Sequence, residues 1–252
     1  DTMYGQGGDD TILGGAGDDT VFGDGANSFN QGNDILFGGS GNDTIDGGGG
    51  LDVALFTGNR SSYTITWDSA NSRHNVVGTD GTDTAKDVEF LVFEDEVLTL
   101  DNVGGFTTTT AGSYASGRLV VGTSGIDSAT LANTGVVYAA LAGQDGINGG
   151  TGHDAIWGGG GADTIQGGVG RDILNAGTDG GWISYSNSTN AVTVNLLTGV
   201  NTGGDAEGDV IVNSLWIQGS ANNDSLTGDA NNNWLNGSAG ADILDGGAGS
   251  DY

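Results

Sequence analysis

Aspartate recurs along this chain at intervals of nine residues, each time behind a glycine-rich stretch. Residues 38–46 read Gly-Gly-Ser-Gly-Asn-Asp-Thr-Ile-Asp, which is the pattern G-G-x-G-x-D-x-U-x with U a large aliphatic residue. Such a turn offers oxygen atoms from a carboxylate and from main-chain carbonyls. Hard divalent cations prefer oxygen ligands, and clustered carboxylates in a flexible loop suit the loose geometry of Ca²⁺ better than the strict geometry of Mg²⁺. This spacing therefore predicts calcium binding.

The predicted ligands are the aspartates at the sixth position of each nine-residue repeat. They are Asp1, Asp10, Asp19, Asp34, Asp43 and Asp52, then Asp145, Asp154, Asp163 and Asp172, then Asp224, Asp242 and Asp251. Asn233 takes this position once, which lowers the charge of its site and should weaken it. Aspartate is also an ordinary turn residue that bonds its own backbone. Turn chemistry alone, however, does not require a nine-residue period, so we favour the array of metal sites.

The elements that must position these aspartates follow from the same period. Three residues make a short strand and six remain to reverse the chain, so two repeats complete one coil of a parallel β-roll. The middle residue of each strand points inward. The predicted inward residues are Met3, Ile12, Val21, Leu36, Ile45, Ile147, Ile156, Ile165, Leu174, Leu226, Leu235 and Ile243.

Turns on the same side of such a roll lie two repeats apart, so each ion should be shared by aspartates of successive coils. The predicted pairs are Asp1 with Asp19, Asp10 with Asp34, Asp19 with Asp43, Asp34 with Asp52, Asp145 with Asp163, Asp154 with Asp172, and Asp224 with Asp242. A six-residue insertion, 23–28, precedes the repeat at 29–37 and makes the two sites of Asp34 the least regular.

Composition supports a chain that needs cations to fold. It has 33 acidic residues against 5 basic ones, a formal charge of −28, 52 glycines and only 35% hydrophobic residues. Such a chain cannot offset its conformational entropy with an ordinary core, and its charge opposes compaction. Nucleic acid and anionic membranes are poor partners for this charge. The longest apolar run, 136–142, is far short of the roughly 20 residues that a spanning helix needs, so no direct membrane insertion is expected.

The repeats and the intervals between them predict six segments. These are a first β-roll block at 1–55, a β-rich spacer module at 56–103, a Thr-rich linker with a degenerate repeat around Asp127 at 104–139, a second β-roll block at 140–184, a β spacer at 185–218, and a third β-roll block at 219–252. The predicted fold class is all-β, with parallel β-roll blocks interrupted by small β-rich spacer modules.

No catalytic residues are expected in this chain. His74 and His153 are its two histidines, which excludes the H-E-x-x-H zinc motif, and neither a G-x-S-x-G elbow nor a G-K-[ST] phosphate loop occurs. Carboxylates committed to calcium cannot act as the protonated acid of a glycosidase. Cysteine is absent, so disulfides and thiolate metal sites are excluded.

Several outward strand positions carry large apolar side chains where a solvated roll should be polar. They are Tyr4, Leu13, Phe22, Phe37, Leu55, Trp157 and Trp234. Two interpretations stay open: the 56–100 and 185–218 segments cover these faces, or uncovered aromatic faces mediate side-by-side self-assembly.

The nonapeptide pattern resembles the calcium-binding repeats of RTX (repeats-in-toxin) proteins. Residues 83–84, 88–89 and 93–95 resemble a small β-module found beside such repeats, and residues 192–196, 203–205 and 208–209 resemble the spacers between repeat blocks. The resemblance implies a bacterial protein that is secreted unfolded through a one-step channel and folds in external calcium, at the cell surface or beyond. It leaves two functional classes: a structural surface protein of adhesin or S-layer type, or the secretion and folding module of a toxin or exoenzyme.

Overall fold

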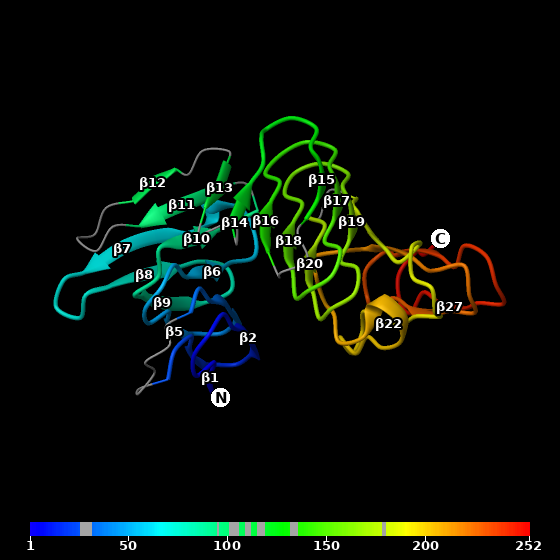
Figure 1. Cartoon of the computed structure of the whole chain (residues 1–252). Coiled ribbons are helices and arrows are strands. Elements are labelled where there is room, and N and C mark those ends of the chain that lie inside the picture. The colour runs from blue at the N-terminus through cyan, green and yellow to red at the C-terminus, as the bar shows by residue number, and fades with distance from the viewer. Residues whose placement is uncertain are drawn as a thin grey trace. The chain divides into compact units, whose positions relative to one another are not determined.

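A computed structural model describes residues 1–25, 32–94, 96–100, 106–108, 112–114, 119–131, 136–177 and 180–252 (Figure 1). Outside these ranges lie the second half of the insertion 23–28, the start of the repeat 29–37, Asp95, much of the Thr-rich linker, and residues 178–179 near the end of the second repeat block. The chain forms two compact units, Asp1–Val121 and Gly122–Tyr252. None of the helices in the described part is both long and apolar enough to cross a membrane.

The first unit begins as a roll whose strands alternate between two parallel sheets. One sheet holds β1 (Thr2–Tyr4), β3 (Thr20–Phe22), β5 (Thr44–Asp46) and β9 (Thr82–Lys86). The other holds β2 (Thr11–Ala16), β4 (Ile35–Ser40), β6 (Val53–Leu55) and β10 (Phe90–Val92). Consecutive strands thus lie in opposite sheets, which is the predicted coil.

Antiparallel strands extend both sheets of the first unit. Beside β9 lie β8 (Arg73–Val77) and then β7 (Thr64–Asp68), which follows the short 3-10 helix η1 (Arg60–Ser62). Beside β10 lie β11 (Val97–Leu100) and β12 (Phe106–Thr108). The antiparallel pair of β13 (Gly112–Tyr114) and β14 (Leu119–Val121) belongs to neither of these two sheets. The predicted β-rich spacer is therefore built onto the edges of the roll.

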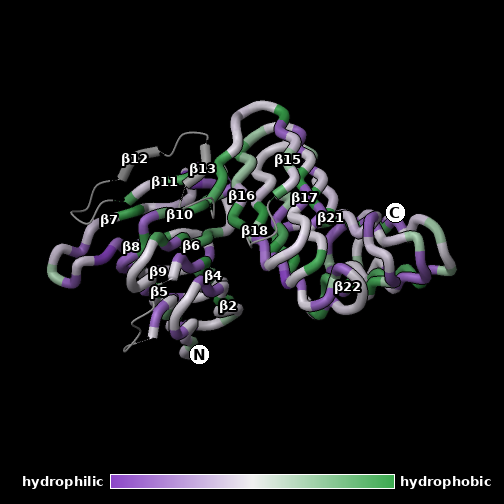
Figure 2. The backbone as a smooth tube through the Cα atoms, in the orientation of Figure 1, coloured by the Kyte–Doolittle hydropathy of each residue, from purple (hydrophilic) through white to green (hydrophobic). Residues whose placement is uncertain are grey.

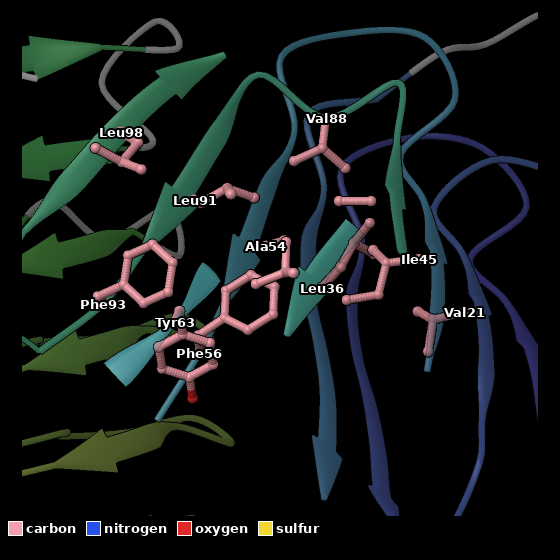
Figure 3. Close-up of a cluster of buried hydrophobic side chains, with 12 residues drawn as sticks. Val21, Leu36, Ile45, Ala54, Phe56, Tyr63, Val88, Leu91, Phe93 and Leu98 are labelled. Carbon is pink, nitrogen blue, oxygen red and sulfur yellow. The ribbon is translucent and has the colours of Figure 1, made fainter. Parts of the chain in front are cut away.

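One apolar cluster joins the roll to this spacer (Figure 3). Its roll members include Val21, Leu36 and Ile45, all 1% exposed or less, and Met3 and Ile12 pack against it. From the spacer come Phe56, Tyr63, Val76, Ala85, Val88, Leu91, Phe93 and Leu98. The thin core predicted for the roll alone thus continues into aromatic packing outside the repeats.

The second unit is a longer roll with the same alternation. One parallel sheet contains β15 (Ser128–Thr130), β17 (Gly146–Asn148), β19 (Thr164–Gln166), β21 (Trp182–Ser184), β24 (Trp216–Gln218) and β26 (Trp234–Asn236). Opposite it lie first β16 (Val137–Ala139), β18 (Ala155–Trp157), β20 (Ile173–Asn175) and β23 (Val210–Val212), then β22 (Thr193–Asn195), β25 (Ser225–Thr227) and β27 (Ile243–Asp245). A 3-10 helix, η3 (Gly204–Ala206), precedes β23.

The inward residues of the second unit follow the period, with one exception. Ile147, Ile156, Ile165, Leu174, Leu226 and Leu235 are all buried, and Figure 2 shows hydrophobic stretches on strands such as β16 and β18. The prediction for Ile243 is wrong: its side chain is 68% exposed, and Leu244 is the residue in register with Leu226. Ile243 directly follows Asp242 and so stands at the seventh position, whereas the eighth position points inward.

The outward apolar residues divide into covered and uncovered groups. Phe37, Leu55 and Trp157 are buried, whereas Tyr4 is 52% and Trp234 46% exposed. Covering by the rest of the chain therefore explains the first group, and the aromatic side chains of β1 and β26 stay accessible.

Candidate calcium sites in the turns

One hydrogen bond recurs from coil to coil and fixes the sixth-position aspartates. The backbone N–H of Asp19 donates to Asp43 Oδ1 at 2.8 Å, and the N–H of Asp145 donates to Asp163 Oδ1 at 2.9 Å. The same bond joins Asp10 to Asp34, Asp34 to Asp52, Asp154 to Asp172, and Asp224 to Asp242. The structure thus places both members of each of these predicted pairs on successive coils.

Asp1 departs from this arrangement in its side chain. Its nitrogen, here the amino terminus, contacts Asp19 Oδ1 at 2.6 Å, but its side chain is 92% exposed. Asp251 lies at the other end of the chain, where its Oδ1 accepts the N–H of Asn233 at 2.9 Å.

The second carboxylate oxygen of many sixth-position aspartates is buried without a hydrogen-bond partner in the described part of the chain. This holds for the Oδ2 atoms of Asp19, Asp34, Asp43, Asp52, Asp145 and Asp172. All six residues are at most 4% exposed. Leaving an ionised group buried and unpaired costs several kcal/mol. A bound cation is the partner that would remove this cost.

Main-chain oxygens face the same small spaces. A Cβ placed on Gly14 would collide with the carbonyl oxygen of Gly38 on the next coil and would lie 2.9 Å from Asp19 Oδ2. A Cβ on Gly149 would meet the Gly167 carbonyl oxygen and Asp154 Oδ2 in the same way. Glycine is therefore needed at the first position because carboxylate and carbonyl oxygens of successive coils converge there. This all-oxygen donor set fits Ca²⁺.

No three histidine, aspartate or glutamate side chains gather closely enough to hold a metal by themselves within the described ranges. Each site must therefore combine carboxylates with main-chain carbonyls, which is what the short nine-residue turn provides.

Burial raises the pKa of these carboxyl groups. The pKa of Asp34 is raised to about 6, that of Asp52 to about 7 and that of Asp172 to about 8, with desolvation as the largest cause in each case. Neighbouring carboxylates add to the effect, above all Asp209 beside Asp172. The pKa values of Asp43 and Asp145 are raised for the same reason. Negative charge in these turns is thus unfavourable until a cation offsets it.

Three carboxylates outside the predicted ligands complete the same pattern. Asp43 N–H donates to Asp83 Oδ1 at 2.8 Å, and Asp52 N–H donates to Glu89 Oε2 at 2.8 Å. In the second unit, Asp172 N–H donates to Asp209 Oδ1 at 2.9 Å, and the buried Tyr185 hydroxyl donates to Asp209 Oδ2 at 3.0 Å. Glu89 and Asp209 each directly precede a short apolar strand, β10 and β23, whereas Asp83 lies inside β9.

The degenerate repeat around Asp127 also joins the array. Asp127 N–H donates to Asp145 Oδ1 at 2.7 Å, and the Asp127 carboxylate itself accepts bonds from Thr123. Its turn is therefore stacked on the second repeat block.

The two histidines hold structural positions. His153 Nδ1 accepts the backbone N–H of Arg171 at 2.9 Å, which links two turns of the second unit. His74 is 4% exposed and its ring lies 4.8 Å from that of Trp67, measured between centroids.

The fold and these turns define a parallel β-roll with candidate calcium sites between successive coils. RTX calcium-binding nonapeptide repeats match residues 1–29, 30–54, 141–181 and 218–252, which together make up just over half of the chain. The chain therefore belongs to the RTX calcium-binding nonapeptide repeat family, whose repeats bind several Ca²⁺ ions.

No curated protein matches the chain. Among solved structures, the extracellular lipase LipA from Serratia marcescens is similar, with 19% sequence identity and a TM-score of 0.29. That similarity covers 92% of this chain and 31% of the lipase chain, so this chain spans about a third of the lipase's length.

Proposed function

We propose that this chain is a calcium-binding structural segment of a secreted or cell-surface protein, which folds and stiffens in extracellular Ca²⁺ and supports a surface assembly of S-layer or adhesin type. The observation that carries the proposal is the series of buried aspartate Oδ2 atoms without partners in the described turns. No catalytic group is assigned.

The proposed ligands are the sixth-position aspartates predicted above. Each ion takes carboxylate oxygens of one or two of them and carbonyl oxygens such as those of Gly38 and Gly167. Divalent ions in these turns would neutralise much of the formal charge of −28, which otherwise opposes compaction. Ions between coils would add to the stability that the thin apolar core provides.

The expected affinity favours an extracellular setting. Extracellular calcium modules bind with dissociation constants of about 10⁻⁴ to 10⁻³ M, so the turns would stay empty inside a cell and fill outside it. Without ions a glycine-rich chain with so little apolar surface cannot offset the entropy of ordering. Folding and metal binding are therefore coupled.

An aromatic row on the second unit supports the assembly part of the proposal. Trp182, Trp216 and Trp234 stand side by side on β21, β24 and β26, with ring centroids 5.4 and 5.3 Å apart, and Tyr252 lies 6.0 Å from Trp234. Trp234 is 46% and Tyr252 81% exposed. Contiguous exposed apolar surface usually marks a contact, and a second copy of this chain is the proposed partner.

The test is a calcium titration followed by far-UV circular dichroism and light scattering, with Mg²⁺ as the control. We expect a cooperative gain of β signal near about 1 mM Ca²⁺, absent with Mg²⁺, and scattering that rises with it. Trp234→Ser should keep the gain of β signal and lose the scattering. A chain already folded in excess chelator would contradict calcium-coupled folding. A folded chain that stays monomeric would contradict the assembly part and favour a secretion and folding module instead.

A further inference from the structure

The spacer of the first unit contains one more coil of the roll. Residues 78–86 read Gly-Thr-Asp-Gly-Thr-Asp-Thr-Ala-Lys. This stretch keeps two of the three glycines and the sixth-position aspartate of the repeat, but it has threonine at the second position and alanine in place of the large aliphatic residue. This stretch lies outside all four segments that match the repeat family. Its strand β9 nevertheless pairs with β5 in parallel, with Ala85 in register with Ile45.

The turn before β9 stacks on the roll as a repeat turn does. Gly41 N–H donates to the Asp80 carbonyl oxygen at 2.8 Å, just as Gly17 N–H donates to the Ser40 carbonyl oxygen at 2.8 Å one coil earlier. Thr82 N–H donates to Asn42 Oδ1 at 3.0 Å, which repeats the bond from Asn42 N–H to Asp18 Oδ1. Asp83 therefore occupies the place that Asp43 occupies in the preceding coil.

On the opposite side, Glu89 takes the place of an aspartate in a shortened turn. The turns before β2 and β6 hold six residues, whereas only Asp87, Val88 and Glu89 separate β9 from β10. Phe90 is in register with Val53, so Glu89 lies beside Asp52. The glutamate side chain is longer than that of aspartate and so reaches Asp52 from the shorter turn. Its Oε2 accepts the Asp52 N–H at 2.8 Å.

The backbone of this short turn also supplies the expected carbonyl oxygen. Gly47 N–H donates to the Lys86 carbonyl oxygen at 2.9 Å, as Gly23 N–H does to that of Asp46. A Cβ on Gly47 would collide with the carbonyl oxygen of Asp87 and approach Asp52 Oδ2, so oxygens of the spacer and of the roll meet as in the repeat turns.

Hydrogen bonding alone leaves part of this geometry unexplained. One acceptor oxygen on residues 83 and 89 would satisfy the backbone N–H groups of Asp43 and Asp52, and a neutral amide could provide it. The Oδ2 atoms of Asp43 and Asp52 are nonetheless buried without hydrogen-bond partners in the described structure, in residues 1% and 0% exposed. Each of these oxygens belongs to a residue whose N–H donates to one of the additional carboxylates, and a bound cation would remove the cost of leaving it unpaired.

We propose that Asp83 and Glu89 complete two further calcium sites, with Asp43 and Asp52 respectively, and that the two ions fasten the spacer strands β7–β9 to the roll. The inference rests on the proposed function, because the sites extend its rows of ions into a segment that lacks the repeat motif. Calcium then holds together not only the coils but also the module beside them.

The test compares Asp83→Asn, Glu89→Gln and Glu89→Asp with wild type in the whole chain. Asp68→Asn is the matched control, because it removes one charge from β7 of the same spacer. Bound calcium is counted by equilibrium dialysis and atomic emission at about 1 mM free Ca²⁺. Hydrogen exchange of residues 64–86 reports whether the spacer is held. We expect Asp83→Asn and Glu89→Gln each to lose one ion per chain and to expose the spacer amides at least tenfold more often, with Asp68→Asn unchanged.

Glu89→Asp tests whether the length of the side chain matters in addition to its negative charge. It keeps the carboxylate but shortens the side chain, so it should also lose its ion if Glu89 is a ligand across the short turn. If Glu89→Gln and Asp83→Asn bind as many calcium ions per chain as wild type, this inference is overturned while the proposed function stays intact. A wild-type chain that binds no calcium would instead contradict the proposed function itself.

Discussion

The second and third repeat blocks belong to one unit and share one parallel sheet, yet their turns are completed differently. In the second block, the sixth-position aspartates Asp145 and Asp172 are at most 2% exposed and keep an Oδ2 without a partner in the described structure. In the third block, Asp224 is equally buried, but Ser220 donates to both of its oxygens, through Oγ at 2.8 Å and through N–H at 2.6 Å.

The outer coils of the third block differ further. Asn233 replaces an aspartate and accepts the Asp229 N–H at 2.8 Å, while Asp242 and Asp251 are partly exposed. Leu244, in register with the buried Leu226, is 49% exposed. The repeat motif therefore determines the coil, whereas a neighbouring side chain such as Ser220 determines whether a buried carboxylate already has its own donors.

The largest expected effect comes from Asp145→Asn. Its Oδ1 would still accept the Asp127 N–H, but a charged ligand would be lost. Because ligand charge sets affinity, we expect the calcium midpoint for folding of the second block to rise about tenfold or more. Hydrogen exchange of residues 146–166 during a calcium titration measures this shift of the midpoint.

Asp242→Asn is the matched control for Asp145→Asn. Asp242 also accepts a backbone N–H, from Asp224 at 2.9 Å, but its side chain is partly exposed and solvent screens its charge. The calcium midpoint of the third block should rise less than about threefold. Equal shifts for the two substitutions would show that burial does not distinguish the two blocks.

Much of the fold of both blocks could be predicted from the sequence, because the nine-residue period is local. It predicted the alternating coil, the pairing of aspartates two repeats apart, and inward residues such as Ile156 and Leu226. The error at Ile243 was a shift of one position within a repeat, and in a strand such a shift reverses the direction of the side chain.

The sequence did not predict the carboxylates that tertiary packing brings to the roll. Asp83, Glu89 and Asp209 lie 40, 37 and 37 residues from the aspartates whose N–H groups they accept, instead of the usual 18. Their turns lack the full motif, so the period could not find them. The sequence also did not predict that Ser220 donates to Asp224, because this depends on one hydroxyl at a position where the repeat has glycine.

A smaller effect is expected from Asn233→Asp, which makes the third block more like the second. Asn233 is 1% exposed and its N–H donates to Asp251 Oδ1, so the added carboxylate joins a site that already holds one acid. We expect the calcium midpoint of the third block to fall about threefold. Hydrogen exchange of residues 225–245 measures it, and Asn236→Asp adds the same charge at an exposed strand position as the control. An unchanged midpoint in Asn233→Asp would contradict a metal site there.

The smallest effect should follow from Ser220→Ala. The substitution removes the hydroxyl that donates to Asp224 Oδ1 but keeps the backbone N–H that donates to Oδ2. A carboxylate released from one competing donor is a better calcium ligand, so the calcium affinity at Asp224 should rise by about twofold. Isothermal titration with Ser225→Ala as the control measures the change. Weaker calcium binding in Ser220→Ala would mean that the hydroxyl orients the carboxylate for the ion rather than competing with it.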